Sequence, residues 1–437
     1  MTFEAFEATK HRNVTFINPI AAISCAITAI LMLTLTRKKA LIPFFIMLML
    51  IPMNQVIVVA TLDFSLYRIL IIIGLIRLTI CSEFYPPTKN NIDKTIYLLV
   101  ISICVVYILQ WQTVGAVIYR AGYALDIIGS YILFRSFIRD FEDIDRIIKV
   151  FVFISVIIAF SMVIEQIAQI NIFSIFGSIS KSVFFRDGRI RSMGSFGNPI
   201  YIGTFGGVML PFFTYLWTRN RKLSIAGIIA ASIITLTSSS SGPVLSYIAA
   251  ITALLLYPFR VYMRKIKWGI LFLIVALHLY MKSPVWAIID RVSIFKSSTS
   301  YHRFVLIDQF IRRFNEWWFL GTKSTEHWGH HVDIQTWDVS NQFIRIGVDG
   351  GFISLFFFIL LINFCFSSIE KGISVFENNN ERRVLVWTMG VMLFAHIIAF
   401  MGVSYYGQML FVWLLTITLI STINDLSKNQ LLIKNEM

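Results

Sequence analysis

The sequence predicts an all-α fold: one membrane domain, residues 1–437, built as a bundle of about twelve or thirteen transmembrane helices. Three observations predict it. Of the 437 residues, 57% are hydrophobic and 14% are charged, whereas soluble domains carry roughly a quarter charged residues. Apolar runs repeatedly reach the ~18 residues that indicate a membrane-spanning helix. These runs lack the polar–apolar alternation of barrel strands, so their backbone groups must be satisfied within helices.

The apolar runs predict the spans in chain order. They cover residues 18–36, 40–60, 64–80, 95–112, 113–138, 147–170, 199–218, 222–237, 243–259, 267–281, 342–366, 384–403 and 406–422. Basic residues gather in alternate connections, at 37–39, 135–149, 219–222, 260–267 and 371–383. Because cytoplasmic loops are enriched in Lys and Arg, this alternation predicts a cytoplasmic C-terminus and an outside N-terminus. The alternative is twelve spans with both termini inside, which Lys10 and Arg12 favour.

The formal charge of +14 does not indicate a nucleic-acid partner, because most basic residues lie in short loops and no binding motif is present. Membrane lipid is the expected environment. The four cysteines lie in or beside apolar runs, where cysteine usually acts as a small hydrophobic residue. Residues 1–16 contain Glu4 and Glu7 and no cleavage pattern, so the first span is expected to remain in the protein.

Two long connections are predicted on the outside. The short extracytoplasmic loop covers 171–198 and the large extracytoplasmic loop covers 284–341. Connections of this length in a compact protein usually carry function or are disordered. The large loop contains five tryptophans between Trp286 and Trp337, a composition that argues for a folded segment.

The short loop has an unusual density of basic residues for this side of the membrane. Arg189 and Arg191 are candidate members of an anion clamp, since guanidinium groups bind phosphate oxygens bidentately. The alternative is a hydrated basic loop that binds anionic lipid head groups. Gly194 and the Asn198-Pro199 pair are expected to shape a tight turn into the next span.

The large loop is predicted to contain an amphipathic helix that lies flat on the membrane or on top of the bundle. Its apolar face is formed by Phe304, Ile307, Phe310, Ile311, Phe314 and Trp318, and its polar face by Asp308, Gln309, Arg312, Arg313 and Glu316. Arg303 falls on the apolar face, where a charge needs an anionic partner such as a substrate phosphate. Alternatively, the helix begins one residue later and Arg303 reaches solvent. Arg120, inside a predicted span, is the third candidate for the same anion site.

Three histidines near carboxylates, His327, His330 and His331, allow two chemical interpretations. They could bind zinc, but the absence of HExxH or a cysteine partner argues for a site without metal. Proton transfer by His331 or Asp338 is the favoured alternative to a merely hydrated loop. Elsewhere, Asp126, Glu165 and His396 lie within spans, so each is expected to be functional or internally paired.

Four segments carry a resemblance to a known family. They are Arg191–Pro199; Ser238–Pro243; Ser298–Arg303, which opens the large loop; and Asn341–Gly351, which closes it and includes Gly350. In this order they resemble the O-antigen ligase and polymerase superfamily of membrane glycosyltransferases. Two departures stand out. The second segment lacks the arginine of the family's Ser-Arg-Gly turn, and Ser340 stands where ligases of the family have a histidine.

The resemblance implies a reaction without metal or cofactor in the inner membrane of a bacterium. A sugar hydroxyl attacks the anomeric carbon of an undecaprenyl-pyrophosphate-linked oligosaccharide, and arginines stabilise the departing pyrophosphate. The expected product is an O-antigen of lipopolysaccharide, a capsule or an exopolysaccharide. A chain-length regulator and a flippase are candidate protein partners.

Three functions are therefore weighed. The first is a polymerase that joins lipid-linked repeat units, which the absent ligase histidine favours. The second is an O-antigen ligase that transfers finished polymer. The third is a flippase or transporter, a class that usually shows repeated halves and a polar site at the bilayer midplane. No internal repeat is visible, and the polar residues concentrate in the outside loops.

Overall fold

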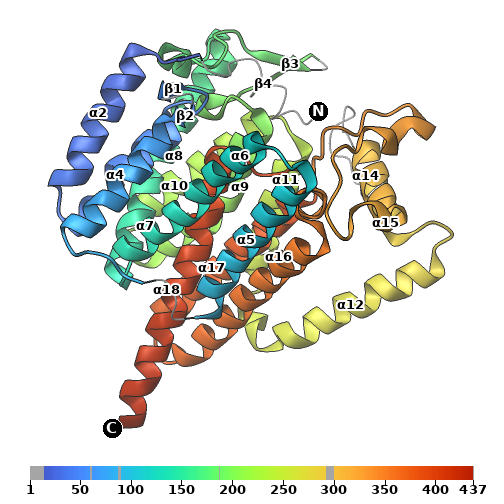
Figure 1. Cartoon of the computed structure of the whole chain (residues 1–437). Coiled ribbons are helices and arrows are strands. Elements are labelled where there is room, and N and C mark those ends of the chain that lie inside the picture. Colours follow the sequence, from blue (N-terminus) through green and yellow to red (C-terminus); the bar gives the residue numbers. More distant parts are fainter. Residues whose placement is uncertain (1–13, 60–61, 87–89, 187, 292–299, 437) are drawn as a thin grey trace.

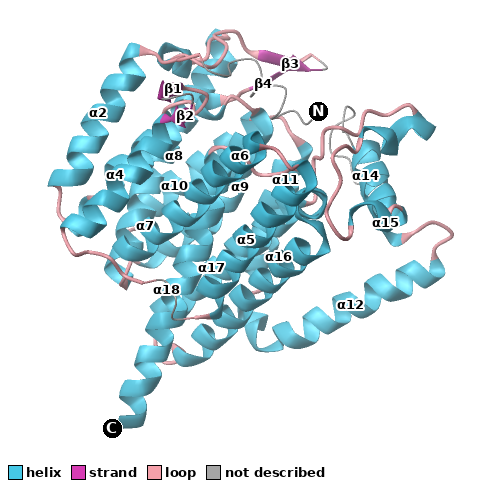
Figure 2. Cartoon of the chain, in the orientation of Figure 1, coloured by secondary structure: helices cyan, strands magenta, loops and turns pink. Residues whose placement is uncertain are grey.

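The structure is a computed structural model that describes residues 14–59, 62–86, 90–186, 188–291 and 300–436. Helices dominate it (Figure 2). Seven described helices are long and apolar enough to cross a membrane. They are α5 (Asn91–Trp111), the α6–α7 unit (Val114–Phe137), α8 (Phe141–Ala168), α9 (Pro199–Tyr215), α16 (Gln342–Val375), α17 (Asn380–Phe400) and α18 (Gln408–Glu436). The protein is therefore a multi-pass, all-α membrane helix bundle, as the composition predicts.

Shorter helices occupy most of the remaining predicted spans. They are α2 (Pro19–Thr34), α4 (Leu66–Ile80), α10 (Arg221–Thr237), α11 (Ser241–Leu255) and α12 (Met263–Tyr280). Helix α12 stands apart from the bundle (Figure 1), and none of its described side chains is buried. The bundle proper is therefore formed by the other helices.

The predicted span 40–60 is wrong as a continuous helix. Helix α3 covers only Leu41–Leu50 and ends where Ile51 adopts an extended conformation. The physical reason is Pro52, because the residue before a proline is disfavoured in the helical region. The chain then forms β1 (Val56–Val59), which pairs antiparallel with β2 (Leu62–Ser65).

The predicted basic connections gather at one end of the bundle, here named the basic end. Arg37 donates to Asp143 over 3.0 Å, and Lys38 pairs with Glu142 at 3.0 Å. In the same way, Arg219 forms ion pairs with Asp145 of α8 and Glu381 of α17. Segments from four parts of the sequence are thus joined by charge pairs at this end.

The opposite end, here named the loop end, joins the long connections. Gln408 Nε2 donates to the Ser195 carbonyl over 3.3 Å, and Ser404 Oγ donates to the Val339 carbonyl. Helix α2 also begins here, since the Asn18 amide donates to Gln55 Oε1 over 2.9 Å. Because α2 and α18 both start at the loop end and run away from it, the first and last described helices end on the same side of the bundle, the basic end (Figure 1).

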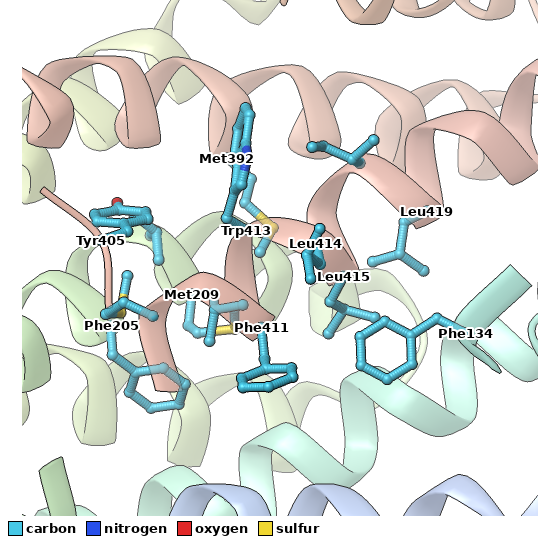
Figure 3. Packing of buried hydrophobic residues seen from close by; sticks show 14 of the residues in the cluster. Phe134, Phe205, Met209, Met392, Tyr405, Phe411, Trp413, Leu414, Leu415 and Leu419 are labelled. Carbon is cyan, nitrogen blue, oxygen red and sulfur yellow. The ribbon is translucent and has the colours of Figure 1, made fainter. Parts of the chain in front are cut away.

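The core of the bundle is built around α18. Figure 3 shows Phe411, Trp413 and Leu415 of this helix packed among side chains of neighbouring helices, including Phe205 and Met392. In a membrane the lipid is as apolar as these side chains. Close van der Waals packing therefore holds the helices together more than the hydrophobic effect does.

Ionisable residues inside the helices are paired with one another. Arg68 donates to both carboxylate oxygens of Asp126, over 2.8 and 2.6 Å. His396 has Tyr405 Oη at 2.8 Å and Thr416 Oγ1 at 3.0 Å. Internal pairing, one of the two alternatives for such residues, is therefore what Asp126 and His396 show.

Candidate functional site

The short loop brings three arginines to one face of a small hairpin. Strand β3 (Phe184–Arg186) pairs antiparallel with β4 (Arg189–Arg191), and Arg186 stands opposite Arg189. Cross-strand partners and residues two apart in a strand share a face. The side chains of all three arginines therefore project from the same face of the hairpin. Arg189 is exposed near the tip, whereas Arg191 is buried at the base with its guanidinium carbon 5.7 Å from the Phe184 ring centre.

The segment after this hairpin is held by helices. Glu165 of α8 accepts hydrogen bonds from the Met193 amide at 2.9 Å and the Gly194 amide at 3.1 Å. Gly194 has φ +52°, the left-handed region that glycine adopts readily. Asn198 then caps α9 by accepting from the Ile200 amide at 2.8 Å, and Pro199 is the first helical residue. These contacts position the base of the hairpin.

Arg191 reaches the turn between α10 and α11. Its Nη2 donates to Ser240 Oγ, and the neighbouring Ser192 amide donates to the Thr237 carbonyl over 3.1 Å. Ser240 is the residue that precedes the first turn of α11. Arg191 is therefore fixed at a helix N-terminus, which carries a partial positive charge of its own.

Arg303 comes to the same turn from the large loop. A methyl group on Gly242, in the first turn of α11, would lie 3.8 Å from its Nη2. A methyl group on Gly402, between α17 and α18, would lie 3.2 Å from its guanidinium carbon. The Arg303 guanidinium thus lies beside the backbones of two glycines. One of them, Gly242, follows Ser240, the serine that Arg191 contacts, by two residues.

Arg303 has no anionic partner among the described residues. It forms no ion pair there, and its Nε is buried without a hydrogen-bond partner. Burial lowers the pKa of the Arg303 guanidinium, and the nearby charge of Arg186 lowers it further. Burying a charge without a partner is costly. The arrangement therefore favours binding of an anion that contacts Arg303.

The helix that carries Arg303 differs from the predicted one. It is α14 (Ser300–Arg312), followed by α15 (Phe314–Trp317). The predicted polar face is wrong at two positions, because Asp308 and Gln309 are buried, with 8% and 7% of their surface exposed, whereas Arg312 and Glu316 are exposed as predicted.

The partners of these polar residues explain the difference. Asp308 accepts from Trp286 Nε1 at 3.2 Å and from Arg312 at 2.7 Å, while Gln309 accepts from Arg313 at 2.9 Å. In contrast, Ile311 is 47% exposed. The helix packs into the folded loop through a polar network, and hydrophobic periodicity does not predict such a buried face.

Arg120 lies in a separate cluster. It forms an ion pair with Asp349 of α16 at 3.0 Å, and its guanidinium carbon lies 3.8 Å from the Tyr107 ring centre. Arg345 also contacts Asp349, at 3.1 Å. These partners differ from those of Arg191 and Arg303, so the described contacts do not bring Arg120 to the same site.

The proposed proton acceptors occupy different surroundings. The side chain of His331 lies outside the described residues, although its backbone belongs to η8 (Glu326–Val332). Asp338 is exposed, and its charge acts on His302. His302, which lies in the opening segment Ser298–Arg303 and was not predicted to have a role, has Nε2 2.9 Å from the Gln335 carbonyl oxygen.

The closing segment of the large loop begins α16. Asn341 caps this helix by accepting from the Phe343 amide at 3.0 Å and the Ile344 amide at 3.2 Å. Helix α16 is interrupted at Gly351, which has φ 65° and ψ −174°. Gly350, its neighbour, is buried in the helix. The kink lies against the large loop, as the Phe352 amide donates to the Trp318 carbonyl over 2.8 Å.

Arg186 and His302 are the two residues that sequence reasoning did not assign. A hairpin pattern would have paired Arg186 with Arg189, but no local signal links His302 to Gln335. Within the described segments, no group of three or more His, Cys, Asp or Glu side chains could hold a metal ion. The sequence matches no protein-family model and no curated protein.

Proposed function

We propose that this protein is a polymerase of a bacterial surface polysaccharide, either an O-antigen or a capsule-type polymer. The single observation that supports it most is the approach of Arg191 and Arg303 to the first turn of α11, with the charge of Arg186 acting on Arg303. Cations at a helix N-terminus suit a ligand with several anionic oxygens. A pyrophosphate that joins an undecaprenyl lipid to a glycan has this chemistry.

The reaction needs stabilisation of a leaving group. The acceptor hydroxyl oxygen forms a bond to the anomeric carbon of the donor glycan. The bond from that carbon to the pyrophosphate oxygen breaks, and its electron pair leaves with the lipid pyrophosphate. Fixed cations beside the departing oxygens stabilise the charge that develops in the transition state. Arg303 is suited to this task because no carboxylate in the described structure neutralises it.

The proposed orientation of the protein in the membrane follows from the difference between the two ends of the bundle. We place the basic end in the cytoplasm, according to the positive-inside rule. The loop end, with the arginines, then faces the outside of the inner membrane, where lipid-linked repeat units are presented. Counting the short helices, the chain crosses the bilayer about thirteen times in this arrangement.

A transporter is the less supported alternative. Transporters bind substrate near the bilayer midplane, whereas here Arg68 is paired with Asp126 and Arg120 with Asp349. Arg303, which no carboxylate of the described residues neutralises, lies at the loop end. A ligase is less supported because Ser340 stands where the resemblance leads one to expect the histidine of ligases.

The test uses a deletion strain of the source bacterium complemented with variants. We expect Arg303→Ala to reduce polymer formation by about 10- to 100-fold, since a hydrogen bond to a charged group contributes roughly 1.5–3 kcal/mol. Arg303→Lys should also lose most activity, because it keeps the charge but not the bidentate geometry. Lys323→Ala is the control, because it removes an exposed cation of the same loop that takes no part in the polar network of α14. Wild-type polymer from Arg303→Ala would contradict the proposal.

The deletion strain itself separates the three functions. Loss of a polymerase leaves surface molecules that carry a single repeat unit. Loss of a ligase leaves long polymer on the lipid carrier and none on the surface, which would overturn the proposal. Loss of a flippase leaves lipid-linked units on the cytoplasmic face, and that result would overturn it equally.

A further inference from the structure

His302 occupies an unusual position in the large loop. It directly precedes Arg303 in α14 and contacts the segment that closes the loop. One imidazole nitrogen, Nε2, is 2.9 Å from the Gln335 carbonyl oxygen, and the other, Nδ1, is 3.5 Å from Ser340 Oγ. The ring is therefore held from both sides by residues that follow it by more than thirty positions in the chain.

The Gln335 contact decides which nitrogen carries the proton. A backbone carbonyl only accepts hydrogen bonds, so Nε2 must carry the hydrogen that faces it. In the neutral ring Nδ1 then has a lone pair, and this lone pair points toward the Ser340 hydroxyl. A histidine oriented by one nitrogen and open to a hydroxyl at the other has the arrangement of a general base.

The surroundings keep this ring neutral. Burial lowers the pKa of the His302 imidazole, and the charge of Arg303 lowers it further. The Gln335 carbonyl and the charge of Asp338 act in the opposite direction, but the pKa remains below its ordinary value. A neutral imidazole is the form that can accept a proton, and it is present at neutral pH.

We propose that His302 is the catalytic base of the polymerisation reaction and accepts the acceptor's proton at Nδ1, beside Ser340. This inference rests on the proposed function and deepens it. His302 and Arg303 are consecutive in α14, so one helix carries the base and the pyrophosphate-binding cation at neighbouring positions, about 100° apart around its axis. As the acceptor oxygen bonds to the anomeric carbon, its proton moves to Nδ1 and the electron pair of the broken bond leaves with the pyrophosphate. The imidazolium then releases the proton to water.

The first experiment measures elongation against pH. Detergent extracts that contain wild-type or variant protein receive lipid-linked repeat units isolated from the deletion strain. Wild-type activity should fall only below about pH 6.5, because the pKa of His302 is below that ordinary value. His302→Gln keeps an amide that can donate to the Gln335 carbonyl but loses the Nδ1 lone pair. We expect it to reduce the rate about 100-fold or more and to remove the fall at low pH.

A matched control and a rescue distinguish catalysis from folding. His327→Gln changes another loop histidine, which pairs with Glu316 at 2.9 Å. This variant should keep both the elongation rate and the fall in activity at low pH, here called the acid limb. His302→Gln combined with Ser340→His returns an imidazole to the same place, so part of the rate and the acid limb should reappear.

Three outcomes would each overturn a claim. If His302→Gln elongates at the wild-type rate with the same acid limb, His302 is not the base, although the proposed function stands. If His302→Gln is inactive and the double variant recovers neither rate nor acid limb, the role of His302 is positional and the inference is wrong. If the wild-type protein does not elongate the repeat units at any pH, the proposed function itself fails.

Discussion

Gly351→Ala tests whether the kink of α16 supports the large loop. At φ 65° and ψ −174°, Gly351 occupies a backbone region that is essentially restricted to glycine. A methyl group there would lie 2.5 Å from the Phe319 carbonyl oxygen and 3.1 Å from the Trp318 carbonyl oxygen. Because both contacts are to backbone, the neighbouring segment must move as a whole.

The expected cost combines two effects. Forcing a side chain into this backbone region costs roughly 1–3 kcal/mol. Displacing the loop also weakens the hydrogen bond from the Phe352 amide to the Trp318 carbonyl, and such a bond contributes roughly 1 kcal/mol. The total of about 2–4 kcal/mol should lower the thermal unfolding temperature of the purified protein in detergent micelles.

Gly269→Ala is the matched control for this measurement. Gly269 lies in α12, and a methyl group there would have nothing within 4 Å. Since alanine is the better helix former by roughly 1 kcal/mol, this variant should unfold at the wild-type temperature or slightly above it. If Gly351→Ala also unfolds at the wild-type temperature, the structural argument for the kink is refuted.

Two further predictions concern topology and buried charge. With the four native cysteines replaced by serine, Lys323→Cys should react with an impermeant thiol reagent from outside, and Lys222→Cys only after the membrane is opened; the reverse pattern would contradict the orientation. Arg68→Ala leaves the buried Asp126 carboxylate without its cation and with the hydrogen bond to Tyr67 alone, and should destabilise the protein by roughly 3–5 kcal/mol. Replacing both residues by leucine should recover most of this loss in the same thermal unfolding assay, and no recovery would argue against an isolated pair.

The apolar runs were sufficient to predict most helices, because a membrane helix needs only length and hydropathy. They failed where a single residue decides the backbone, as at Pro52, which ends α3 well before the predicted span does. They also failed for the large loop. There the buried face is decided by polar partners such as Asp308 and Trp286 rather than by hydrophobic spacing.

The candidate site could be predicted only in part. The unusual position of Arg303 is visible in the sequence, because a charge interrupts an apolar helical face. Its neighbours are not visible, since Gly242 and Gly402 approach it only after the helices pack. The same holds for His302, whose two contacts come from a segment that folds back over α14. Contacts between distant segments carry no signal in local periodicity.

The central claim, that Arg303 belongs to a pyrophosphate-binding site, is tested most directly by a binding measurement. Purified wild-type protein, Arg303→Ala and the control Lys323→Ala are each titrated with undecaprenyl pyrophosphate in detergent micelles, and the dissociation constants are compared. The account predicts a dissociation constant about 10- to 100-fold larger for Arg303→Ala than for the other two proteins. Equal affinity for all three proteins would contradict it.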